Sequence, residues 1–262
     1  MDSLSLPSNI TILIIPGSCS PAPLYFALVS NLQAISGIDT VVYGLPSGNR
    51  LPPEEPASLA DDAAFIGSKI RELADAGKDV ILVPHSYGGL VAGEACHTLA
   101  KDERAKAGLP GGVVRIVYLT CVVAGPGESS SDACAQLNFD WLLPLEGSDQ
   151  FIYNTDAGAS RVLSDLPPDK GVETIRKFSP QSTRSFTDKV VHDAFRHIQA
   201  SWILCEQDAV LPPDWQKGKI EFLKSVRPDK RVDVLSLDAG HCPNASDPEG
   251  AARKVLEAIA VK

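Results

Sequence analysis

The stretch that decides the fold is Val80-Ile-Leu-Val-Pro-His-Ser-Tyr-Gly-Gly-Leu-Val-Ala-Gly93, in the first half of a chain of 262 residues. An apolar run leads directly into Ser86, and the small residues after it favour a helix that begins at once. A strand that turns this sharply into a helix lifts the serine hydroxyl above the carboxyl edge of a sheet, in a strained conformation. Ser86 is therefore a candidate nucleophile, although the same letters taken alone also fit an ordinary strand-to-helix turn.

The glycines after the serine support this interpretation. Such a turn prefers glycine two positions before and two positions after the serine, because the chain is expected to pass close to itself there. Gly88 meets the preference, whereas Pro84 stands where the first glycine is usual. Gly89 allows the next helix to pack tightly, and the amino end of that helix favours negative charge developing beside Ser86.

Apolar runs and helical stretches alternate along the rest of the chain. Runs that predict buried strands occupy residues 10–15, 40–43, 80–83, 113–119, 201–204 and 231–235. Helical patterns cover 24–35 and 58–76, the second opened by Ser58 and Asp61 in capping-box spacing, and a last helix begins at Asp247-Pro248. Strands separated by helices in this way predict an α/β fold with a mostly parallel, doubly wound sheet.

One long segment interrupts this alternation. Between about Gly125 and Gln199 no strong strand pattern occurs, and aromatic residues stand among turn residues. An insertion of this length between two strands usually forms a functional cap or lid. The alternative is a plain helical decoration that only shields the sheet. We expect a single domain over residues 1–262, with residues 125–199 as the cap.

The acid and the base that a serine nucleophile needs are expected on loops after later strands. Asp208 follows the strand that ends near Leu204, and His241 follows the last strand. In a parallel sheet both loops leave the same edge as Ser86, which predicts a triad of Ser86, His241 and Asp208. Two alternatives stay open: Glu206 is a rival acid, and His241 also fits an ordinary loop histidine.

Fixed hydrogen-bond donors are needed as well, because negative charge develops on the substrate oxygen during attack. The backbone N–H of Tyr87, directly after the serine, is one candidate. Ser18, in the loop after the first strand, is the other, although this loop also fits a simple turn and carries no phosphate-binding pattern. The side chains expected to contact the substrate are those of Cys19, His85, Phe139 and Trp141.

Composition excludes several classes of protein. With 24 Lys and Arg against 33 Asp and Glu, the formal net charge is −9, and 44% of the residues are apolar, which excludes a disordered chain and a basic nucleic-acid-binding protein. Met1–Pro7 has no cationic start, and the run Ile10–Ile15 is too short for a leader or a membrane span. The six cysteines are scattered, without zinc-site spacing. We therefore expect a cytoplasmic monomer or homodimer that binds a small molecule, and no metal, membrane or nucleic acid.

Four of the segments above together resemble the α/β-hydrolase fold superfamily over nearly the whole chain. They are Ile-Ile-Pro-Gly-Ser at 14–18, Pro-His-Ser-Tyr-Gly-Gly at 84–89, Glu-Gln-Asp-Ala-Val-Leu-Pro at 206–212 and Ala-Gly-His at 239–241. The chain is most similar to the branch of methylesterases and hydroxynitrile lyases. The resemblance implies a helical cap inserted after the sixth strand. It also implies a serine hydrolase that cleaves a carboxylic ester, lactone or thioester of a small to medium apolar substrate, through an acyl-enzyme and without a cofactor.

Other reactions on the same fold stay open at this point. The hydroxynitrile lyases of this branch carry a lysine directly after the catalytic histidine, where this chain has Cys242, so cyanohydrin cleavage is not expected. A lyase, a cyclase or a carbon–carbon bond hydrolase could reuse the triad as an acid and base pair. A ligand-binding protein could reuse the pocket, but the intact set of Ser86, Asp208 and His241 argues against it.

Overall fold

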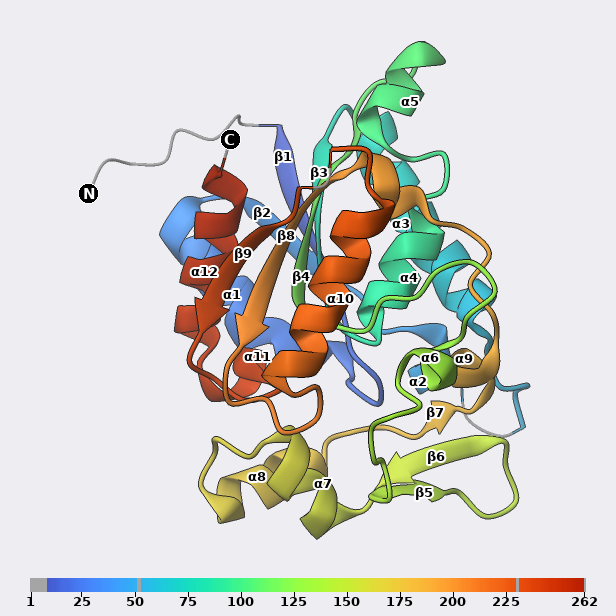
Figure 1. The fold of residues 1–262 in the computed structure, drawn as a ribbon, viewed down its shortest axis with the longest axis vertical. Coiled ribbons are helices and arrows are strands. Elements are labelled where there is room, and N and C mark those ends of the chain that lie inside the picture. The colour runs from blue at the N-terminus through green and yellow to red at the C-terminus, as the bar shows by residue number, and fades with distance from the viewer. Residues whose placement is uncertain (1–8, 51–52, 230, 262) are drawn as a thin grey trace.

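A computed structural model describes residues 9–50, 53–229 and 231–261, and it is built around one parallel sheet. The sheet has the order β2-β1-β3-β4-β8-β9, and all neighbouring strands run parallel (Figure 1). The parallel sheet predicted from the sequence is confirmed. Its strands are β1 (Ile10–Ile15), β2 (Asp39–Val42), β3 (Asp79–Ser86), β4 (Gly112–Cys121), β8 (Gln199–Cys205) and β9 (Asp233–Leu237).

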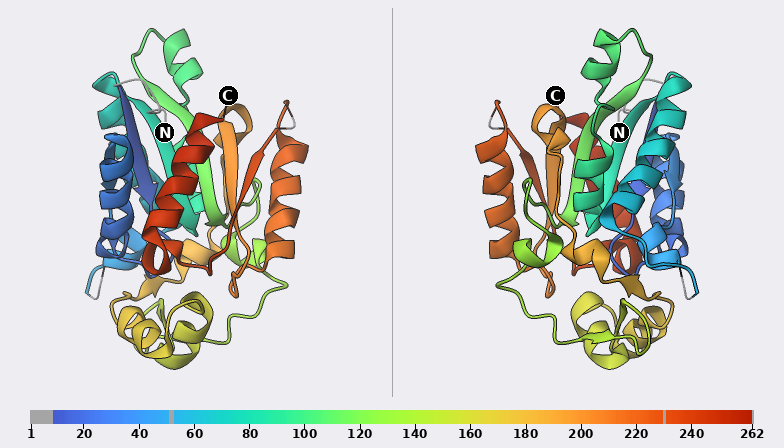
Figure 2. Two further views of the ribbon diagram at one scale, coloured as in Figure 1. Left: turned by 90° about the vertical axis from the view of Figure 1, so that its left-hand side faces the viewer. Right: turned by 90° about the vertical axis from the view of Figure 1, so that its right-hand side faces the viewer.

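Helices cover both faces of the sheet because its strands are apolar on both sides. In β1, Ile12 and Ile14 pack on one face and Leu13 and Ile15 on the other, and all four are fully buried. The first face is covered by α1 and α12, and the second by α3, α4 and α10 (Figure 2). The helices outside the β4–β8 connection are η1 (Ala22–Tyr25), α1 (Phe26–Ser36), α2 (Pro46–Asn49), α3 (Leu59–Asp75), α4 (Gly88–Ala95), α5 (Lys101–Lys106), α10 (Pro213–Val226), α11 (Pro243–Ser246) and α12 (Pro248–Ala260).

Two helix starts were predictable from capping residues alone. The Ser58 hydroxyl accepts the N–H of Asp61 at 3.0 Å, and the Asp61 carboxylate accepts the N–H of Ser58 at 2.8 Å, so the predicted capping box of α3 is confirmed. Asp247 caps α12 by accepting the N–H of Gly250 at 2.9 Å. Both helices therefore start where the side chains satisfy free backbone donors.

Residues 122–198 connect β4 to β8, and we name them the insertion. It contains an antiparallel sheet in the order β5-β6-β7 as well as helices, so the expectation of a purely helical cap is wrong. The insertion also follows the fourth strand along the chain, not the sixth, because only β1 to β4 precede it in the described ranges. Its elements are α6 (Ser130–Ala133), β5 (Leu142–Pro144), β6 (Gln150–Tyr153), α7 (Thr155–Val162), α8 (Pro168–Ile175), β7 (Gln181–Ser182), α9 (Arg184–Thr187) and η2 (Ala194–His197).

The insertion lies mainly beyond the carboxyl ends of the parallel strands, at the bottom of Figure 1. That edge is where ligands bind in open α/β sheets.

All six cysteines are buried and unpaired. No helix in the described ranges combines the length and the apolar character needed to cross a bilayer. The start of the chain, Met1–Pro7, which the sequence predicts not to be a leader, lies outside the described residues.

Candidate active site

The strand-to-helix turn at Ser86 is strained. Ser86 ends β3 with a φ of +51°, in the left-handed region that serine rarely occupies. Gly88 permits the turn, because a Cβ there would lie 2.5 Å from the carbonyl oxygen of Ile15 and 2.7 Å from that of Pro16. The atoms nearest to such a Cβ belong to the end of β1 and to Pro16 directly after it.

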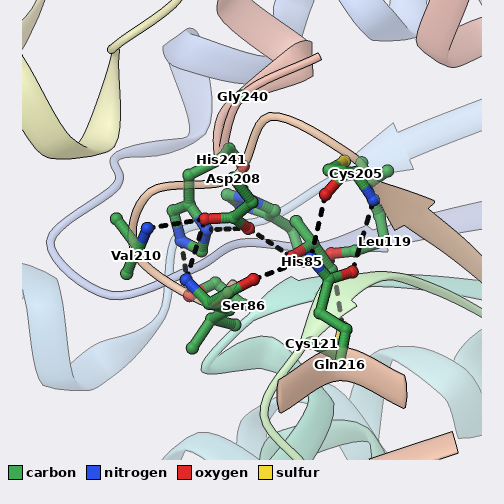
Figure 3. Close-up of polar contacts among 12 residues, drawn as sticks. His85, Ser86, Leu119, Cys121, Cys205, Asp208, Val210, Gln216, Gly240 and His241 are labelled. Carbon is green, nitrogen blue, oxygen red and sulfur yellow. Dashed lines mark hydrogen bonds and ion pairs between the residues drawn. The ribbon is translucent and has the colours of Figure 1, made fainter. Parts of the chain in front are cut away.

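Three side chains from three loops form one hydrogen-bonded chain at this edge of the sheet (Figure 3). His241 Nε2 lies 3.0 Å from Ser86 Oγ, and His241 Nδ1 lies 2.8 Å from Asp208 Oδ2. Because a carboxylate only accepts hydrogen bonds, Nδ1 carries the hydrogen and Nε2 can accept the serine proton. All three residues are buried. The structure therefore brings together the three residues expected for a triad.

Asp208 is fixed by hydrogen bonds on both carboxylate oxygens. Oδ1 accepts the backbone N–H groups of Val210 at 2.7 Å and Leu211 at 2.8 Å. Oδ2 accepts the Thr120 hydroxyl at 2.5 Å in addition to His241. Burial acts to raise the pKa of Asp208, but the charge of His241 and these hydrogen bonds outweigh it and hold that pKa below its usual value. Asp208 is thus an ionised partner for an imidazolium.

The rival acid and the supporting threonine are also placed by the structure. The side chain of Glu206 is exposed, and the carboxylate that meets His241 is that of Asp208.

Thr120, next to the end of β4, was not identified from the sequence. Its φ of +40° is a second strained conformation beside the site. A threonine in a β-branched strand gives no sequence pattern that would have distinguished it.

His85 forms a neutral link beneath the triad. Its Nε2 lies 2.7 Å from the carbonyl oxygen of His241, and its Nδ1 lies 2.7 Å from the Tyr25 hydroxyl, which accepts the N–H of Gly17 at 2.8 Å. The carbonyl can only accept, so Nε2 donates and Nδ1 accepts from the phenol. Burial, followed by the charge of His241, lowers the pKa of His85 to about 3. No second positive charge therefore forms beside His241.

The loop after β1 is held by the insertion. The Ser18 hydroxyl lies 2.9 Å from that of Tyr153, and the backbone N–H of Cys19 donates to Gln181 Oε1 at 2.6 Å. Cys19 has a φ of +58°, so this loop also contains a strained residue, in addition to Ser86 and Thr120. Ser18 and Tyr87, the two expected donors to an oxyanion, both line the same cavity as Ser86.

A narrow, mainly apolar cavity adjoins Ser86. It holds about 20 Å³ of open space, roughly the room of one water molecule. Phe139 and Trp141 line it, as expected from the sequence. Cys19 and His85 are not among the residues that line it, and their expected contact with the substrate stays a prediction. The full lining is Ser18, Ser86, Tyr87, Val122, Ser130, Cys134, Phe139, Trp141, Leu142, Tyr153, Phe186, Val210, Leu211 and His241.

These features define the class of the protein. A serine on a strained turn after a central parallel strand, with a histidine and an aspartate on later loops, is the arrangement of the α/β-hydrolase fold. Residues 12–254 match the model of the alpha/beta hydrolase family. The chain belongs to the alpha/beta hydrolase family, and the resemblance noted from its sequence is confirmed.

Individual relatives agree with the family match. The chain is 32% identical over 239 residues to "Probable hydrolase R7" of Phoma sp. (strain ATCC 20986 / MF5453), covering 91% of this chain and 93% of that protein. It is 24% identical over 259 residues to methylesterase 7 of Arabidopsis thaliana, covering 93% and 94%. A pyrethroid hydrolase from Sphingobium faniae JZ-2 shares the fold, with a TM-score of 0.72 at 21% identity over 96% of this chain and 98% of that one. Together the relatives support a hydrolytic enzyme.

Proposed function

We propose that this protein is a serine hydrolase that cleaves a carboxylic ester, lactone or thioester through an acyl-enzyme. The observation that carries the proposal is the continuous chain from Ser86 Oγ to His241 to Asp208 on a strained turn. The curated relatives include a probable hydrolase and a methylesterase, which supports hydrolysis of an ester. Its location in the cytoplasm and its state as a monomer or homodimer stay predictions.

The geometry supports a two-step reaction. His241 Nε2 takes the proton of Ser86 as Oγ attacks the carbonyl carbon, and Asp208 stabilises the imidazolium. The backbone N–H groups of Ser18 and Tyr87 hold the negative oxygen of the tetrahedral intermediate. His241 then returns the proton to the departing alcohol or thiol, which leaves an acyl group on Ser86. Water, deprotonated by His241, then attacks the acyl carbon. The bond from that carbon to Ser86 Oγ breaks, His241 returns the proton to Oγ, and the acid is released.

The cavity favours a neutral, apolar substrate. Among the described residues, none that lines the cavity is an Asp, Glu, Lys or Arg. Aromatic rings form much of its wall. Because only about 20 Å³ is open beside Ser86, a substrate can enter only if the wall moves. The insertion supplies Phe139, Trp141 and Tyr153 to that wall, which supports its proposed role as a cap over the site.

Cyanohydrin cleavage is not supported at this site. Cys242 stands where the hydroxynitrile lyases of the related branch carry lysine, and burial raises the pKa of its thiol far above the usual value. A neutral, buried thiol cannot supply the positive charge that such a lysine would bring.

The test is the activity of Ser86→Ala on p-nitrophenyl acetate and butyrate. We expect a loss of kcat of at least about 10⁴-fold, because Ser86 Oγ is the hydroxyl that contacts His241 Nε2. Ser68→Ala is the matched control, since Ser68 is an exposed serine on α3 that bonds only its own helix. Full activity in Ser86→Ala would exclude the proposed mechanism.

A further inference from the structure

A buried carboxylate stands behind the serine turn, outside the triad. Asp62, on α3, is 0% exposed. Its Oδ1 accepts the backbone N–H of Ser47 at 2.8 Å, and its Oδ2 accepts the hydroxyls of Ser47 at 2.6 Å and of Tyr87 at 2.8 Å. Within the described residues, no ion pair includes Asp62. Two hydroxyls and one backbone N–H are therefore the groups that offset the loss of hydration of this buried carboxylate.

Such a group costs stability. Burial raises the pKa of Asp62 to about 6, even though the hydrogen bonds from Ser47 and Tyr87 act in the other direction. A buried charge without a cationic partner contributes little or nothing favourable to folding. An apolar side chain would avoid the buried charge, but it would leave the N–H and hydroxyl of Ser47 and the hydroxyl of Tyr87 without their acceptor. The position of Asp62 therefore needs an explanation other than packing.

The partner of this carboxylate is Tyr87, which directly follows the nucleophile. The ring of Tyr87 is 1% exposed and stacks on Phe186 of the insertion, with centroids 5.5 Å apart and planes at 13°. Burial raises the pKa of the Tyr87 phenol well above its usual value, so the hydroxyl stays protonated and donates. The side chain is thus fixed on its face by Phe186 and at its tip by Asp62.

The strained backbone of Ser86 gives these contacts a role. A residue at a φ of +51° keeps that conformation only if its surroundings hold it there. On one side, both ring nitrogens of His85 are hydrogen-bonded. On the other side, the hydroxyl of Tyr87 is bonded to Asp62. The two neighbours of the serine are therefore anchored independently of each other.

We propose that Asp62 is a positioning residue that acts through the Tyr87 hydroxyl to hold the serine turn and the Tyr87 backbone N–H in place for attack. This inference rests on the serine-hydrolase function proposed above, and it adds a residue that touches neither the substrate nor the triad. Its role is to prevent small displacements of the oxyanion donor, because displacements of about 1 Å lower rates by up to about 100-fold.

The test compares variants that break the Asp62–Tyr87 hydrogen bond from either side. In Tyr87→Phe, kcat on p-nitrophenyl acetate is expected to fall about tenfold with KM changed less than about twofold, because the ring keeps its place on Phe186. Asp62→Ala is expected to lose a similar factor, and the double variant no more than either single one, because the two groups act as a unit. Asp62→Asn should lose less than Asp62→Ala, since the oxygen of its amide can still accept a hydrogen bond from the Tyr87 hydroxyl.

Tyr118→Phe is the matched control, with thermal unfolding followed for every variant. Tyr118 is a buried tyrosine of β4 whose hydroxyl has no partner within the described residues, so kcat should not change. Unchanged kcat in Tyr87→Phe, with Ser86→Ala inactive, would overturn the positioning role and leave the proposed function standing. The proposal would also be overturned if the loss of kcat in the double variant equalled the product of the losses in the two single variants. If Asp62→Ala does not fold, Tyr87→Phe and Asp62→Asn decide the question.

Discussion

Asp208 and Glu206 stand two positions apart in the sequence, but only Asp208 is buried against His241. Asp208→Asn should lower kcat by about 10³- to 10⁴-fold, because an amide in this place favours the wrong tautomer of His241 and cannot stabilise its charged form. Glu206→Gln, a matched change at an exposed carboxylate, should leave kcat unchanged. Steady-state kinetics on p-nitrophenyl butyrate measure both. A large loss in Glu206→Gln would mean that the acid has been assigned to the wrong residue.

The same contrast shows which residues a sequence can reveal. Ser86, Asp208 and His241 were predictable because each follows a strand with a clear apolar pattern, and parallel strands end at one edge. Tyr25 and Thr120 were not, because neither belongs to a recognisable motif and each reaches the site only through a tertiary contact, Tyr25 with His85 and Thr120 with Asp208. Such pairs depend on how loops pack, and neither a tyrosine nor a threonine is unusual where it stands.

At the scale of the element, the start of α4 depends on the absence of a side chain at Gly88. Gly88→Ala should destabilise the protein by about 1–3 kcal/mol and lower kcat, because the new Cβ would meet the backbone carbonyl of Ile15 at 2.5 Å. Gly218→Ala, the same change inside α10 with nothing within 4 Å of the added Cβ, should instead stabilise by up to about 1 kcal/mol. Urea unfolding measures both changes. Equal effects would show that Gly88 matters only for helix propensity.

The strands of the insertion could not be predicted from the pattern of apolar and polar residues. The strands β5, β6 and β7 have 3, 4 and 2 residues, which is too short for an alternating pattern to stand out from the surrounding turns. The longer α3, with its capping box and apolar spacing, could be placed within a residue of its observed bounds. The shortness of these three strands therefore explains why the sequence did not reveal the antiparallel sheet of the insertion.

At the scale of the whole molecule, the alternation of strands and helices predicts the parallel sheet, but the shape of the cavity depends on contacts between distant layers. Tyr153 and Gln181 of the insertion hydrogen-bond the loop after β1. Phe186 of the insertion stacks on Tyr87. These contacts join segments that are far apart in the sequence, and the sequence of one segment gives no information about which other segment it contacts. The sequence therefore predicts the edge at which the site lies but not the narrowness of the cavity there.

The balance between stability and function at Asp62 leads to a prediction for the whole chain as pH changes. The pKa of Asp62 is raised from 3.8 to about 6 in the folded protein, so between these values the folded state holds a proton that the unfolded state has released. This group therefore lowers stability as pH rises from about 4 to 6, by up to about 3 kcal/mol. Asp62→Asn should gain stability relative to the natural chain over that range.

The adjacent Asp61 provides a control of opposite sign. Hydrogen bonds from Ser58 lower the pKa of Asp61, so this carboxylate contributes stability above its usual pKa that is lost as the pH falls. Asp61→Asn should therefore be less stable than the natural chain at neutral pH, and the deficit should shrink in acid. Urea unfolding at intervals from about pH 2 to about pH 7 measures both variants, because the loss for Asp61 falls below its usual pKa of 3.8. If the curve of Asp62→Asn runs parallel to that of the natural chain, the buried carboxylate carries no such cost; the positioning role is decided separately by the kcat of Tyr87→Phe.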